Sequence, residues 1–277
     1  MLSWGRTHWL TCIQAFRFYD VIAALSLDTP TLSPLSSDST TGLFAPLDAR
    51  GATRPVGSAD VLLGMATSLW PTIQELSNLS GLKTELQSAT AEGDTTREEA
   101  LRSELERSAA TVEEALMAWQ PENMNVSPNY EGILNSAMAY QHSGLVYLYR
   151  SVRGVSTSHE AVQLHTHVAL CHCVGTVKSK GPMGALLWPL FVAACEAQTV
   201  SDRALAQEAF ESLDRRQRMT NIQRAWDIVQ EVWRRADNRG EAGVGENEGG
   251  TPEGNAEMAR DLWREVSQEM GLRVVFG

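Results

Sequence analysis

The sequence predicts an all-α protein, a single bundle-like domain of about eight or nine helices that spans residues 1–277. Two observations predict this class. Apolar residues recur at three- and four-residue steps through most of the chain, which is the spacing of one helix face. No alternating strand pattern of useful length occurs before the last few residues. Hydrophobic residues make up 43% of the chain, so it can bury a substantial core.

The most apolar window, ALLWPLFVAACE at residues 185–196, is the predicted centre of the fold. Its single charge lies at its end, and it is shorter than the ~20 residues that cross a bilayer. A helix that is apolar on all sides belongs inside a soluble core. Pro189 has no backbone N–H group, so we expect this helix to start or kink there.

The N-terminal part predicts two helices separated by a loop. The first covers about 7–25, and its apolar stripe consists of Trp9, Cys12, Ile13, Phe16, Tyr19 and Ala23. Residues 28–58 are rich in Pro, Ser and Thr and predict a loop. Asp60 can cap the second helix, which runs to about Leu79. A polar gap at 88–94 follows it.

Three more helices are expected before the central one. Thr95 and Glu98 fit a capping box, in which each side chain satisfies a backbone amide of the first turn, at the start of a helix over about 95–119. A more apolar helix follows at about 130–152. Ser158 can cap the next, which runs to about Lys178.

The C-terminal part predicts three helices and one disordered linker. Ser201 or Asp202 can cap the helix after the central one, and Asn221 can cap the next. Residues 237–255 are mostly Gly, Glu and Asn, and we expect them to be disordered. Residues 256–277 then form a last helix and an apolar tail that docks on the body.

Charge and cysteine usage restrict the function. The net charge is −11, from 34 acidic residues against 23 Lys and Arg, which argues against direct DNA binding and against docking on anionic lipid. The four cysteines show no disulfide spacing, which favours a reduced, intracellular compartment.

No residue pattern predicts catalysis or a cofactor. His167 and Cys171 have the four-residue spacing that chelates a metal from one helix, but nothing marks further ligands, so a structural role is favoured. Neither a nucleophile elbow nor a glycine-rich phosphate loop is present. We therefore expect no catalytic residue, no metal site and no enzyme.

Aromatic residues leave two interpretations open. Trp70, Trp188, Phe191 and Trp226 either pack in the core or line an apolar cavity for a small ligand. Glu196 closes the apolar window and needs a partner if it is buried. The candidate partners are Arg203, Arg215 and Arg216.

Several motifs together resemble the fungal-specific transcription factor domain, the helical regulatory domain of zinc binuclear-cluster transcription factors. They are YDVIAALSL at 19–27, LLGMATSLWPTIQELSNL at 62–79, LLWPLFVAACEA at 186–197, VQEVWRR at 229–235 and DLWREVSQEMGL at 261–272. The residues that carry the resemblance, with expected structural roles, are Leu187, Trp188, Pro189, Leu190, Phe191, Glu196, Asn221, Trp233 and Arg234.

The resemblance implies a regulatory domain in the nucleus that contacts the transcription machinery or a homodimer partner, with a small hydrophobic ligand as in sterol-responsive relatives. The six-cysteine DNA-binding cluster of the family, which would hold the zinc, is absent from this sequence, and Met1 falls inside the resemblance. The chain thus resembles a truncated or split regulator, for which the cytoplasm is a second location. Two alternatives remain: a stand-alone helical protein that dimerises with or titrates a regulator, and a metal-dependent enzyme.

Overall fold

The computed structural model describes residues 3–27, 29, 31–32, 60, 63–121, 130–242, 262–272 and 276. Within these residues it contains nine α-helices and no β-strand, which confirms the all-α prediction. None of the described helices is both long and apolar enough to cross a membrane. The elements are α1 (Ser3–Leu27), the 3-10 turn η1 (Ala66–Ser68), α3 (Trp70–Glu92), α4 (Thr95–Ala118), α5 (Tyr130–Tyr147), the π-helical η2 (Leu148–Val152), α6 (Glu160–Lys178), α7 (Leu187–Cys195), α8 (Val200–Gln217), α9 (Thr220–Ala242) and α11 (Leu262–Glu269).

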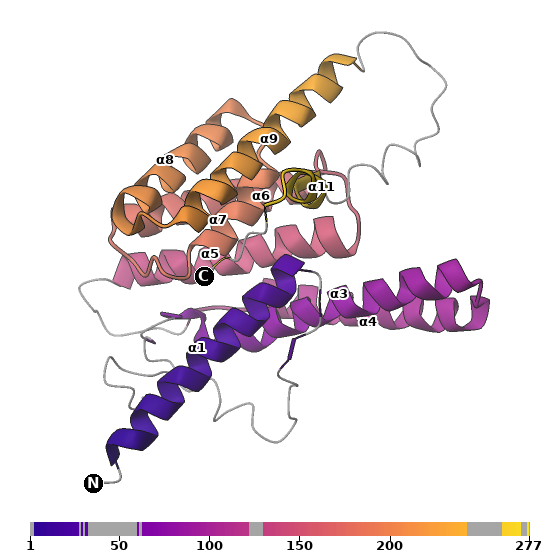
Figure 1. Cartoon of the computed structure of the whole chain (residues 1–277), viewed down its shortest axis with the longest axis horizontal. Helices are drawn as coiled ribbons and strands as arrows, with labels where there is room; N and C mark the ends of the chain where they lie inside the picture. Colours follow the sequence, from indigo (N-terminus) through magenta and orange to yellow (C-terminus); the bar gives the residue numbers. More distant parts are fainter. Residues whose placement is uncertain are drawn as a thin grey trace.

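The helices form two groups that meet at α5 (Figure 1). α3 and α4 are an antiparallel pair that extends to one side, and α1 packs on α3. On the other side of α5, α7 packs against α5, α6, α8 and α9. α11 packs on α9, beside the centre of the molecule. The last helix of the described chain therefore returns to its middle.

α7 is the buried helix that the apolar window predicts. All nine of its residues are buried. Pro189 is its third residue and lies in the first turn, where a backbone N–H group has no acceptor within the helix. The helix therefore starts two residues before Pro189 and continues through it. An aromatic column crosses the core beside α7: Phe18 stacks on Trp70 at 5.1 Å between ring centroids, Trp70 meets Tyr140 edge-on at 5.6 Å, and Tyr140 stacks on Trp188 at 5.7 Å.

The buried face of α1 differs from the predicted stripe. The stacking of Phe18 on Trp70 turns a different face inward, formed by Phe18, Val21, Ile22 and Leu25. Cys12, Phe16 and Tyr19 of the predicted stripe are exposed. The side chains of Trp9 and Ile13 lie outside the described residues.

Helix boundaries correct several other predictions. α3 continues to Glu92, through most of the predicted polar gap, and ends at Gly93 in the left-handed conformation. Asp94, rather than Thr95, caps α4 by accepting a hydrogen bond from the Arg97 backbone N–H group at 3.1 Å. Three further caps also differ from the predicted ones: His159 precedes α6, Thr199 caps α8, and α9 begins at Thr220.

The C-terminal predictions are partly corrected. Residues 237–242 continue α9, so the predicted disordered linker at 237–255 does not begin at 237. Residues 243–255 and the first part of the predicted last helix lie outside the described residues, as does most of the predicted loop at 28–58. Phe276 is 2% exposed and its ring lies 4.6 Å from that of Phe191, so this residue of the tail does dock on the core.

The start of α5 approaches the turn after α6 so closely that only glycine fits. A Cβ atom on Gly181 would lie 2.5 Å from the carbonyl oxygen of Gly132, whereas one on Gly184 would meet no atom within 4 Å. We therefore expect Gly181→Ala to lower the free energy of unfolding by ~1–3 kcal/mol, because the backbone must move. The matched variant Gly184→Ala should change it by less than ~0.5 kcal/mol. Urea denaturation followed by circular dichroism measures both, and equal effects would contradict this explanation.

Candidate functional site

The C-terminal end of α7 lies where long polar side chains from three other helices converge. The Trp233 indole N–H group donates to the carbonyl oxygen of Ala194 at 2.8 Å. Arg203 donates through Nε to the carbonyl oxygen of Ala197 at 3.2 Å, and Gln163 donates to that of Glu196 at 2.9 Å. The last carbonyl groups of a helix have no partner within it, so a buried helix end needs such donors from elsewhere.

Glu196 is buried here in an ion pair with Arg150. Arg150 Nε lies 2.7 Å from Glu196 Oε2, and the two side chains are 6% and 10% exposed. Arg150 also donates to the carbonyl oxygen of Val155. The prediction that the partner is Arg203, Arg215 or Arg216 is wrong, because Arg203 pairs with Asp237, and Arg215 and Arg216 are exposed.

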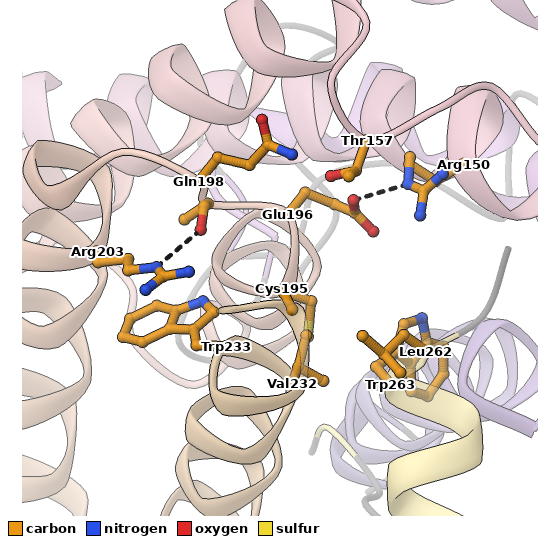
Figure 2. Close-up of a pocket in the computed structure, with 12 residues that line it drawn as sticks. Arg150, Thr157, Cys195, Glu196, Gln198, Arg203, Val232, Trp233, Leu262 and Trp263 are labelled. Carbon is orange, nitrogen blue, oxygen red and sulfur yellow. Dashed lines mark hydrogen bonds and ion pairs between the residues drawn. The ribbon is translucent and has the colours of Figure 1, made fainter. Parts of the chain in front are cut away.

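Next to this ion pair lies a cavity of about 230 Å³ between α7, α9 and α11 (Figure 2). Its polar wall holds Arg150, Thr157, Glu196, Gln198 and Arg203. Its remaining wall holds Cys195, Ala197, Val232, Trp233, Ala236, Leu262 and Trp263. Burial raises the pKa of the Cys195 thiol well above its ordinary value, so this thiol is an unreactive part of the wall.

α11 closes the cavity and joins it to distant parts of the fold. Trp263 meets Phe191 of α7 edge-on, with ring centroids 5.3 Å apart. The adjacent Arg264 reaches the carbonyl oxygens of Leu25 and Ser26 in the last turn of α1 at 3.4 and 3.5 Å. These contacts connect the cavity wall with α1.

Ion pairs attach α11 to α9 as well. Arg235 of α9 lies 2.6 Å from Glu269 and 3.7 Å from Glu265, both on α11. The neighbouring Arg234, part of the motif that carries the family resemblance, is exposed and pairs only with Glu231 on its own helix among the described contacts. The residue that couples the two helices is thus Arg235.

The four aromatic residues considered for a ligand pocket are not in the wall of this cavity. Trp70, Trp188 and Phe191 are 1%, 1% and 0% exposed and pack in the core. Trp226 packs between Phe210 and Trp233, with ring centroids 5.0 and 5.4 Å apart. Trp233 is the aromatic residue of the resemblance that does line the cavity.

The other residues of the resemblance belong to the core or to the start of α9. Leu187, Trp188, Pro189, Leu190 and Phe191 form the buried first half of α7. Asn221 is the second residue of α9 and is partly buried. Of the nine residues, Glu196 and Trp233 are brought together at the cavity.

The candidate chelating pair has other partners. His167 Nδ1 lies 2.6 Å from a carboxylate oxygen of Asp202, and its Nε2 is 3.6 Å from the sulfur of Cys171. Asp202 also belongs to the Thr199 cap of α8. Among the described residues, no group of three or more His, Cys, Asp and Glu side chains is arranged to hold a metal ion.

Three other histidines form a stack between α5 and α6 that sequence reasoning missed. The His142 ring stacks on those of His165 and His172, with centroids 5.1 and 6.0 Å apart. The Nδ1 atoms of His142 and His165 are 2.9 Å apart, so one donates to the other. Burial, together with the neighbouring imidazoles, lowers the pKa of His142 from 6.5 to about 4. Burial also lowers the pKa values of His165 and His172.

The sequence held signals for some of the missed site residues. Arg150 is the one charge in the apolar run 145–152, and a lone charge in such a run needs a buried partner as much as Glu196 does. Trp263 and Arg264 lie within the motif at 261–272, but their spacing gave no indication of what they would contact.

Breaking the buried ion pair should destabilise the fold strongly. We expect Arg150→Met to lower the free energy of unfolding by ~3–5 kcal/mol, because it leaves the Glu196 carboxylate buried without its cation. Adding Glu196→Leu should recover part of the loss, because the second charge is then removed too. Denaturant unfolding of the single and double variants measures this. A double variant as unstable as the sum of both single variants would contradict it.

The histidine stack should make the fold sensitive to acid. The pKa of His142 is lower in the folded than in the unfolded chain, so the unfolded chain binds more protons. This contribution to stability is complete above pH 6.5 and is lost as the pH falls towards about 4. We expect His142→Phe, which keeps a ring in the stack, to flatten the decline of the unfolding midpoint over this range. His159→Asn, at the exposed cap of α6, is the matched control, and equal slopes for all three proteins would exclude the explanation.

Comparison with known proteins identifies the family. The family model described as "Fungal specific transcription factor domain" matches residues 8–277. No curated protein and no solved structure matches the chain. The family match covers nearly all of the helices described above and includes both walls of the cavity. The chain therefore belongs to the fungal-specific transcription factor domain family.

Proposed function

We propose that this chain is the regulatory domain of a fungal transcription factor and that it acts in the nucleus through contacts with other proteins. Membership of the family supports a regulatory role in transcription, and the family is not a class of enzymes. The net charge of −11 favours protein partners over DNA. We propose no catalytic residue and no cofactor, since zinc would belong to a separate DNA-binding cluster.

The observation that supports protein contacts best is the exposed apolar face of α1. Cys12, Phe16 and Tyr19 are exposed, with Phe16 at 55% and Tyr19 at 42%. Their spacing of four and three residues places them on one side of the helix. This heptad-like spacing suits packing against an apolar helix of a partner protein. The opposite face of α1 is held by the core, so the exposed face is presented on a fixed support.

We further propose that a small molecule regulates these contacts by favouring one packing of the helices over another. A ligand shifts such an equilibrium only by the difference in its affinity for the two states. Because α11 contacts both the cavity and the last turn of α1, a ligand that binds one packing more tightly can change how α1 is held.

A second candidate is a stand-alone protein that uses the same face of α1 to pair with a full-length regulator and titrate it. The exposure of Phe16 and Tyr19 supports such pairing as well. The two candidates differ in the conditions under which they affect transcription. A regulatory domain tethered to a promoter changes transcription itself, whereas a titrating protein acts only when expressed untethered beside the regulator.

The exposed face of α1 can be tested with a fusion to an unrelated DNA-binding module at a reporter promoter. We expect Phe16→Glu with Tyr19→Glu to abolish the effect of the fusion on transcription, because two charges oppose burial of this face against a partner. Both residues are exposed, so the melting temperature of the purified chain should change by no more than about 2 °C.

Met117→Glu on α4 is the matched control, because Met117 is also 55% exposed and apolar. It should leave the reporter unchanged. Equal effects of the control and of the α1 variant would contradict a specific role of α1. A fusion that is inactive while the untethered chain inhibits a full-length regulator would favour the titrating protein.

A further inference from the structure

We propose that the cavity between α7, α9 and α11 binds a compact, uncharged amphipathic molecule whose polar end donates a hydrogen bond to Glu196. This inference names the ligand class for the regulation proposed above and rests on it for its biological meaning. Its physical test needs only the purified chain.

The polar end of the site is the free oxygen of the Glu196 carboxylate. Oε2 is bound by Arg150, and no described hydrogen bond reaches Oε1. The Glu196 side chain is 10% exposed and lines the cavity, so Oε1 is an acceptor within reach of a molecule in it. A hydroxyl or amide N–H group on a ligand can donate to Oε1, and a hydrogen bond to a charged acceptor is stronger than one between neutral groups.

Charge compensation in the wall excludes a charged ligand. The Arg150 guanidinium and the Glu196 carboxylate neutralise each other. Arg203 makes two hydrogen bonds to the Asp237 carboxylate, at 2.7 and 2.8 Å. A ligand with a net charge would therefore enter a largely apolar site without a counter-ion.

The opposite wall selects a flat apolar body. Val232 and Leu262 face it with aliphatic side chains, and Trp233 and Trp263 contribute indole rings from two different helices (Figure 2). At ~15–30 Å³ for each water-sized atom, a cavity of about 230 Å³ holds roughly 8 to 15 non-hydrogen atoms. This size suits a one- or two-ring molecule and is too small for a four-ring lipid.

Occupancy of the cavity should act on α11. A ligand that bridges Glu196 and Trp263 adds contacts between α7 and α11, which otherwise meet through aromatic rings such as Phe191 and Trp263. Firmer docking of α11 also holds Arg264 against the last turn of α1. The ligand thus favours the state in which α1 is anchored.

The probe for the test is 2-naphthol, a flat, neutral molecule of this size with one hydroxyl donor. We expect it to bind the full chain with a Kd on the order of 0.1–1 mM, typical of a small ligand in a preformed site. The measurement is a titration of ¹⁵N-labelled protein, following the indole N–H resonances of Trp233 and Trp263. Trp119 lies outside the cavity wall, so its resonance should not move.

Two comparisons locate the site and its polar end. 2-Methoxynaphthalene lacks the donor and should bind at least about tenfold more weakly, because a hydrogen bond to a charged acceptor is lost. Ala236→Trp places a large side chain at the exposed edge of the cavity and should abolish binding of 2-naphthol. Gln230→Trp, on an exposed face of the same helix outside the cavity wall, should leave binding unchanged.

The possible results separate this inference from the proposed function. Absence of 2-naphthol binding, binding that survives Ala236→Trp, or equal affinity for the two naphthalenes would overturn the inference. Each result is obtained without any measurement of transcription. Conversely, an inactive reporter fusion would count against the proposed function and would leave the binding data intact.

Discussion

The structure depends on ending a helix inside its own core. α7 is buried along its whole length, so the carbonyl groups at its C-terminus cannot bond to water. Trp233 of α9 donates to the carbonyl oxygen of Ala194 in α7, which also accepts from the Ala197 backbone N–H group. Gln163 of α6 and Arg203 of α8 donate to the carbonyl oxygens of Glu196 and Ala197, just beyond the helix. Each unpaired buried carbonyl would cost ~1–3 kcal/mol, a large share of the stability of an ordinary domain. Trp233 and α7, both part of the motifs that resemble the family, are therefore joined by a direct hydrogen bond.

The same requirement leaves a partly polar cavity beside the buried helix. The guanidinium, amide and indole groups here are oriented toward carbonyl oxygens. They therefore pack less densely than aliphatic side chains would in the same place. The space left between them is bounded by the buried Arg150–Glu196 pair and closed by α11. A site that combines a fixed polar group with aromatic rings on a separate helix is suited to recognition, because a bound molecule contacts two elements that otherwise share few side chains.

Sequence patterns predicted the helices well and their outer contacts poorly. The apolar window at 185–196 identified the buried helix because a helix without a polar face is stable only inside the core. The stripe of α1 was assigned to the wrong face because periodicity shows that residues share a side, whereas the stacking of Phe18 on Trp70 decides which side is buried. The need of Glu196 for a partner followed from its position, but Arg150 lies 46 residues away in sequence, and its proximity depends on how α5 and α7 pack. Long-range pairing of this kind cannot be read from local spacing.

The hydrogen bonds of Arg264 to the last turn of α1 have a consequence for the order in which the domain assembles. Arg264 lies 238 positions after Ser26 and 239 after Leu25, so these hydrogen bonds span nearly the whole length of the described chain. During synthesis, α1 leaves the ribosome before the other described helices, whereas Arg264, the cation at its C-terminal end, follows with the last of them. The helices from α3 to α9 can therefore pack around α7, and α1 on α3, before Arg264 reaches the last turn of α1. The C-terminal end of α1 thus receives its cation only after α11 has been made.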